Sequence, residues 1–355
     1  MDEDSTAPRR RWRRSRFIAV GVGLAAILAG SVAWMVLRPR PFGEPLPDPN
    51  GYDDLVAAGR MIRGDLTRAD LDGVGNEDQL RALVAANADA LARARVGLGR
   101  RSAVSLAHMD SIHTHIDAAS ALRSLGRVMA CEAALAEREG RPDEAVASCA
   151  DMIRLGRAAS RGGLILDRTI EPAIQHAAIA RMARLAGTLP ADEARRLARE
   201  CERIDADREP LARVADRDLA FGLDRGGLPL KITYLTQRAT MQAMLNAARK
   251  SAERADLRGQ AQLRLIAATL ALRTYALDHP DAPRPPGLAA LVPAYLDAVP
   301  ADPYGRGPLK TRVDGDALIP YSVGPDGRDD GGTRPASPNS SGGDLFFGPS
   351  PEGRP

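Results

Sequence analysis

Aromatic residues are scarce in this chain of 355 residues, which has two Trp, five Phe and six Tyr. Because aromatic and β-branched side chains favour strands, their scarcity argues against a β-sandwich or a β-barrel. Alanine- and leucine-rich runs are frequent instead, and their apolar residues recur every three or four positions. We therefore predict a mainly α fold, in a chain long enough for two or three modules.

Most of the chain also lacks net charge. The formal net charge is +3, and residues 1–16 contain six arginines against Asp2, Glu3 and Asp4, so this basic tail accounts for the whole surplus. A nucleic-acid-binding protein usually presents a basic face on its folded part. The neutral remainder of the chain therefore argues against nucleic acid as a partner.

Recognisable catalytic motifs are missing as well: the chain has no P-loop, no Rossmann fingerprint, no nucleophile elbow and no H-E-x-x-H zinc motif. The remaining candidates are His108, His113 and His115, with Asp110 and Asp117 beside them. On a helix His108 and His115 share a face, and such a group could bind a metal or support acid–base chemistry. Three histidines on the exposed or partly buried face of an ordinary helix are the alternative.

One long apolar run is present, at residues 17–37, and it carries no charge. A helix of this length spans the hydrocarbon core of about 30 Å. Because the arginines precede the run, we predict a single-pass transmembrane helix in the cytoplasmic membrane, with residues 1–16 cytoplasmic and the bulk of the chain extracytoplasmic. The lipid bilayer is then a partner. A cleaved signal peptide is the alternative, since Ser31 and Ala33 form a small-x-small site.

The pattern after this run predicts several segments. Gly140 suits a helix end and Pro142 a helix start, so we expect a tight turn between helices at 122–138 and 144–160. Further helices are expected at 167–186 and 190–204 and from residue 256, and strands at 317–323 and 345–347. The predicted order is a Pro-rich linker at 38–50, a hairpin-rich helical domain at 51–250, an α+β module at 255–348 and a disordered tail at 349–355.

The C-terminal quarter contains an ordered series of turn motifs: LAALVP at 288–293, VPADPYG at 299–305, YSVGPDGRDDGG at 321–332, and Gly343-Asp344-Leu345. Residues 255–348 thereby resemble the globular part of the major pseudopilin of type II secretion systems. The resemblance implies a long helix, then a proline-rich stretch and a hairpin loop that often holds calcium. It does not extend to the N-terminus, where the residues before the apolar run contain no prepilin processing site.

The acidic loop of this module also suggests a metal site from its residue types alone. Asp326, Asp329, Asp330 and Asp344 bring carboxylates together with several glycines, and oxygen ligands in a flexible loop suit Ca²⁺. A structural calcium ion is therefore our cofactor prediction. A solvated Asp/Gly turn without metal is the alternative.

Two of the three cysteines are placed symmetrically in the predicted hairpin. Cys131 and Cys149 each lie nine residues from Gly140, so an antiparallel hairpin puts them level with each other. A disulfide requires Cα atoms within about 7 Å, and tight packing of Ala-rich helices would allow it. Two reduced core cysteines are the alternative, and Cys201 is expected to be buried.

The sequence thus favours a non-catalytic interaction or scaffold protein, linked to secretion or cell-envelope assembly and bound to envelope proteins. The alternative is a membrane-tethered metal-dependent hydrolase that uses His108, His113 and His115. Nothing in the sequence fixes the oligomeric state.

Overall fold

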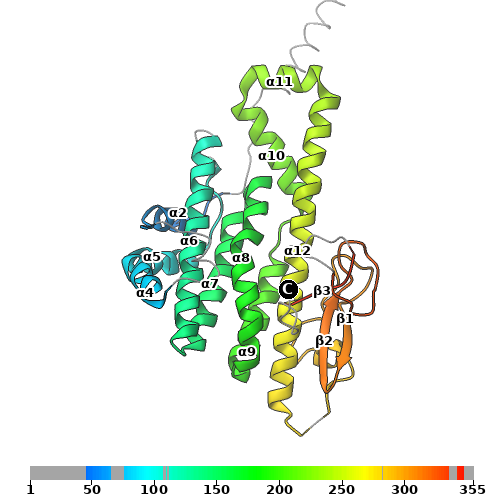
Figure 1. Cartoon of the computed structure of the whole chain (residues 1–355). Helices are drawn as coiled ribbons and strands as arrows, with labels where there is room; N and C mark the ends of the chain where they lie inside the picture. Colours follow the sequence, from blue (N-terminus) through cyan, green and yellow to red (C-terminus); the bar gives the residue numbers. More distant parts are fainter. Residues whose placement is uncertain are drawn as a thin grey trace, which may run out of the picture. The chain divides into compact units, whose positions relative to one another are not determined.

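The structure is a computed structural model that describes residues 45–64, 76–106, 109, 112–281, 283–335 and 342–347 (Figure 1). Contacts between Cα atoms divide the chain into two compact units. The larger contains Gly43–Asp218 and Ala243–Pro355, and the smaller contributes Leu219–Gln242 to the described residues. The described part is mainly helical, which confirms that element of the predicted fold class.

The prediction of a single-pass membrane protein is corrected. Within the described ranges, no helix combines the length and the apolar character that a membrane span requires. The predicted span at residues 17–37 and the basic tail before it lie outside the described residues. The predicted cytoplasmic-membrane location is withdrawn together with the span.

Three antiparallel helices form the centre of the larger unit: α6 (Ile112–Arg138), α7 (Pro142–Ser160) and α8 (Ile165–Leu185). They lie side by side in Figure 1, with α7 packed against both neighbours. The predicted turn is present, since Gly140 has a φ of 70° and the Arg141 N–H donates to the Ala136 carbonyl at 2.8 Å. Most of α7 is buried, including Cys149 and Met152, because helices cover it on two sides.

Three short helices pack beside this centre: α2 (Gly51–Arg60), α4 (Glu77–Ala86) and α5 (Ala88–Leu98). Asn50 begins α2 by accepting the Tyr52 N–H at 3.3 Å, and its amide donates to the Ala103 carbonyl at 2.9 Å. Gly59 lets α2 approach α6 closely, because a Cβ atom there would lie 2.3 Å from the Ala121 carbonyl oxygen.

The chain continues through α9 (Ala191–Ala206), α10 (Leu211–Arg225), α11 (Gly227–Thr236) and the 41-residue α12 (Arg238–Asp278). The helix predicted from Asp256 therefore starts much earlier. The residues from 238 to 255 contain no proline or glycine and are mostly good helix formers. They therefore form one continuous helix with the residues after Asp256. The predicted module boundary at residue 255 falls inside α12.

A short 3-10 helix, η3 (Leu288–Leu291), precedes the strands β1 (Lys310–Asp314), β2 (Ala317–Ser322) and β3 (Leu345–Phe346). They form an antiparallel sheet in the order β1–β2–β3, with Asp314 opposite Ala317 and Tyr321 opposite Phe346. The strands predicted at 317–323 and 345–347 correspond to β2 and β3, whereas β1 was not predicted. The sheet contacts α12, where the Gln262 amide donates to the Phe346 carbonyl at 3.4 Å.

Candidate functional site

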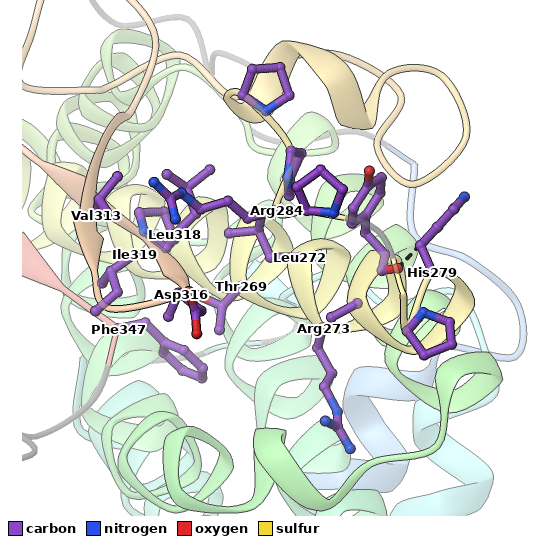
Figure 2. Close-up of a pocket in the computed structure, with 18 residues that line it drawn as sticks. Thr269, Leu272, Arg273, His279, Arg284, Val313, Asp316, Leu318, Ile319 and Phe347 are labelled. Carbon is purple, nitrogen blue, oxygen red and sulfur yellow. Dashed lines mark hydrogen bonds between the residues drawn. The ribbon is translucent and has the colours of Figure 1, made fainter.

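A cleft of about 960 Å³ lies between the C-terminal half of α12, the Pro-rich turn at 283–286 and the β1–β2 hairpin (Figure 2). Half of its lining residues are exposed, so the cleft is open to solvent. Figure 2 shows the hairpin side chains Val313, Leu318 and Ile319 on the same side as Phe347, while His279 lies at the other end. The cleft is therefore mainly apolar at the hairpin end.

Local sequence explains how these elements enclose the cleft. Gly315 has a φ of 57° and forms, with Asp316, the two-residue turn that reverses β1 into β2. The prolines after α12 cannot continue the helix, so the chain turns back towards the sheet. There the Arg284 guanidinium donates to the Gly315 carbonyl at 3.4 Å, which connects the Pro-rich turn to the hairpin.

The polar groups of the cleft do not form a catalytic arrangement. The His279 ring stacks on Tyr275 at 4.6 Å, and its Nδ1 lies 3.1 Å from the Tyr275 carbonyl and 3.4 Å from the Tyr295 hydroxyl. Asp316 lies apart from His279 in Figure 2, and Arg273 extends away from the apolar side chains. No carboxylate of the described residues pairs with His279, so this cleft lacks the nucleophile–base geometry of a hydrolase.

The structure does not bring the predicted histidine group together. His115 is fully buried, with Nε2 at 3.1 Å from Asp167 and Nδ1 at 2.7 Å from the Met109 sulfur. His113 is exposed on the same helix, α6, and His108 lies outside the described residues. Across the described residues, no three His, Cys, Asp or Glu side chains are placed to hold a metal ion.

The four predicted calcium ligands lie in one loop region but bond mainly to backbone. Asp344 is buried and accepts the N–H groups of Gly332, Thr333 and Asp330 at 2.7, 3.1 and 3.4 Å. Burial raises the pKa of its carboxyl. Asp329 accepts the Tyr321 hydroxyl at 2.8 Å and the Gly331 N–H at 3.1 Å, and lies 3.7 Å from the Lys310 ammonium. Asp330 accepts the Gly343 N–H at 3.2 Å, and Asp326 accepts the Arg328 N–H at 3.1 Å. These bonds brace the loop, and calcium binding stays a prediction.

Sequence reasoning missed the role of Asp302. Its buried carboxylate accepts the Tyr304 N–H, the Ser322 hydroxyl and the Val323 N–H at 3.0, 2.7 and 2.7 Å. It thereby attaches the loop before β1 to the end of β2. The Asp-Pro-Tyr-Gly turn was visible in the sequence, but the turn alone does not reveal partners twenty residues away.

All three cysteines are buried, and none of them forms a disulfide. Cys131 belongs to an apolar cluster with Leu80, Ala134 and Leu135, and no disulfide joins it to Cys149. Burial raises the pKa of both the Cys149 and the Cys201 thiol to about 12, so neither is a reactive thiolate.

A buried network of ionic side chains was not predicted from the sequence. Asp256 on α12 accepts hydrogen bonds from Arg168 of α8 and, at 2.9 Å, from Arg208. Arg208 also donates to Glu171 at 2.6 Å, and Arg157 lies in the same cluster. Burial acts to raise the pKa of Glu171, but Arg208, Arg168 and Arg157 lower it below its ordinary value. The network fixes α12, which forms one wall of the cleft, to the central helices.

No protein-family model matches this chain, and neither does any curated protein or solved structure.

Proposed function

We propose that this chain is a non-catalytic interaction protein that binds an extended, apolar segment of a partner protein in the cleft between α12 and the β1–β2 hairpin. The observation that carries the proposal is the open apolar cleft itself. Its volume of about 960 Å³ is at the upper end of the range of about 300–1,000 Å³ for ligand sites. A link to secretion or cell-envelope assembly depends on the family resemblance alone and stays a prediction.

Exposed apolar surface in the cleft provides the driving force. Val313 is 55% exposed, and Leu318, Ile319 and Phe347 are half-buried. Covering such surface is favourable by about 25 cal/mol per Å². A contiguous apolar cleft with polar edges is the kind of surface that soluble proteins use for binding.

The lining favours an extended occupant held by its side chains. Tyr275 and Phe347 provide flat aromatic surfaces, which grooves for extended peptides commonly use. β3 pairs only with Tyr321 and Ser322, so no third strand covers residues 317–320 of β2 within the described structure. Pro320 has no N–H to donate along this edge. Strand addition is therefore limited, and side-chain contacts must supply most of the affinity.

Peptide selection tests the proposal. A random display library of peptides of about ten residues, which extend to about 33 Å, is selected on the full chain with the Leu318→Glu variant as a competitor. We expect enrichment of apolar sequences that the competitor does not remove. Enrichment of no sequence, or of sequences that bind the competitor equally, would contradict the proposal. Zn²⁺-dependent ester hydrolysis that is lost in His113→Ala would favour the hydrolase instead.

A further inference from the structure

A second concave surface lies between α6 and α8, with α7 beneath it. It is a groove of about 530 Å³ that shares no residue with the cleft. Its floor contains the buried side chains Met152 and Ile174, together with alanines from α6 and α8. Its charged side chains are all basic: Arg123, Arg127, Arg181 and Arg184, joined by His176. No acidic residue is among the described residues that line it.

The arginines of the groove are short of carboxylate partners. Arg181 and Arg184 both contact Glu137. Among the described residues, Arg123 bonds only to the Ser120 hydroxyl, at 3.4 Å, and Arg127 forms no ion pair. Four arginines thus share one carboxylate, which leaves a local formal charge of +3, His176 not counted.

Some arginines elsewhere are paired with carboxylates of the chain, whereas others, such as Arg203 and Arg213, form no ion pair with any described residue. Arg81, Arg95 and Arg154 each contact at least two carboxylates. These contacts neutralise arginines on other helices within the chain. The groove is therefore a local basic surface on a chain that is almost neutral outside residues 1–16.

We propose that the α6–α8 groove binds an acidic amphipathic segment of a partner protein. Arg123 and Arg127 are four residues apart on α6 and form one exposed rim, and the exposed Arg184 on α8 forms the other, whereas Arg181 is buried and paired with Glu137. Carboxylates of the segment pair with the three exposed guanidinium groups, and its apolar side chains cover the accessible alanines Ala173, Ala177 and Ala180 of α8. The lining contains no Phe, Tyr or Trp side chain on which a base could stack, which disfavours single-stranded nucleic acid. This groove shares no residue with the cleft, so the test of one proposal does not decide the other.

The test uses a defined probe. A fluorescein-labelled helical peptide of about 16 residues, about 24 Å long, carries repeats of Glu-Leu-Ala-Glu, and its control carries Lys-Leu-Ala-Lys. Fluorescence anisotropy measures the binding of both peptides to the full chain. We expect the glutamate peptide to bind and the lysine peptide not to bind. The affinity should fall as salt rises from about 0.05 M to about 0.3 M, because exposed charges are screened.

Matched charge variants locate the binding. Arg123→Glu/Arg127→Glu should weaken the glutamate peptide at least tenfold. Arg203→Glu/Arg213→Glu makes the same change in net charge at exposed arginines outside the groove, and should change the affinity less than twofold. The substituted side chains are exposed in both variants, so we expect both to fold with melting temperatures close to that of the wild type. Measured melting temperatures check this.

Four outcomes would overturn the proposal. They are equal weakening by the two double variants, absence of binding up to about 1 mM peptide, tighter binding of a single-stranded oligonucleotide of similar length, and full displacement of the peptide by inorganic phosphate at constant ionic strength. The third outcome would assign the groove to nucleic acid, and the fourth would make it a simple anion site.

Discussion

The buried ionic network gives the most quantitative prediction, through the substitution Asp256→Asn. The Asp256 side chain is 8% exposed, and one of its oxygens accepts hydrogen bonds from both Arg168 and Arg208, whose side chains are 1% and 7% exposed. After the substitution, these guanidinium groups and that of Arg157 have Glu171 as their remaining buried carboxylate. The change therefore leaves buried positive charge without compensation.

Removal of one partner from a buried ion pair costs about 3–5 kcal/mol of the free energy of unfolding. We expect a loss in this range for Asp256→Asn, with Arg208 still held by Glu171 at 2.6 Å. Guanidinium denaturation of the full chain, followed by circular dichroism, measures the loss. Asp78→Asn is the matched control: Asp78 is 82% exposed and contacts Arg81 at 2.9 Å, so its loss should be about 1 kcal/mol or less.

A double variant distinguishes the loss of the Arg168–Asp256 attraction from the cost of leaving a buried arginine without its carboxylate. Arg168→Met/Asp256→Leu removes both charges and should recover a large part of the lost stability, because apolar replacements of buried ion pairs are often neutral. A cost for Asp256→Asn as small as that for Asp78→Asn would refute the reasoning. A double variant less stable than Asp256→Asn would do the same.

The remaining predictions concern packing, thiols, acid and calcium. Gly59→Ala should cost about 1–3 kcal/mol because its Cβ meets the Ala121 carbonyl, whereas Gly187→Ala, with no atom within 4 Å, should be close to neutral; equal denaturation midpoints would contradict this. A thiol reagent at pH 8 should modify no cysteine in the native chain and all three in denaturant without reductant, whereas a denatured count of one would reveal a Cys131–Cys149 disulfide. The pKa of Glu171 is lower in the folded state than in the unfolded chain, where it is about 4.3, so its ionised form stabilises the fold above that pH. The free energy of unfolding should therefore fall as the pH drops below about 5, and fall less steeply in Glu171→Gln. Parallel pH profiles of the two proteins would exclude this role. If calcium binds the acidic loop, millimolar Ca²⁺ should raise the melting temperature of the wild type and not that of Asp326→Asn/Asp330→Asn, and equal melting temperatures of the wild type in Ca²⁺ and in chelator would end that prediction.

Local signals in the sequence predicted local structure well. Gly140 and Pro142 placed the turn between α6 and α7 because a left-handed glycine and a proline at a helix start act within a few residues. The predicted start of α12, at Asp256, was wrong because no local signal marks a helix boundary there. The helix begins at Arg238 and continues through Asp256. The residue is important because of Arg168, which lies 88 positions earlier in the chain.

The candidate sites depend on contacts that no local pattern encodes. The cleft combines α12, the Pro-rich turn, the hairpin and Phe347, which are up to about 80 residues apart in sequence. His113 and His115 differ in exposure because residues two apart lie on nearly opposite faces of α6, one towards solvent and one towards the core. A spacing rule alone does not tell which face is buried. The arginines of the groove are separated by an entire helix, α7, and become one surface only when α6 and α8 pack on it.

The central claim, that the cleft binds an apolar segment, is tested most directly by the dissociation constant of one selected peptide. Leu318→Glu places a charge in the cleft, whereas Leu277→Glu changes a 38% exposed leucine of α12 that does not line it. We predict at least tenfold weaker binding to Leu318→Glu, about 1.4 kcal/mol or more, and unchanged binding to Leu277→Glu. Equal dissociation constants for the two variants would contradict the proposed function.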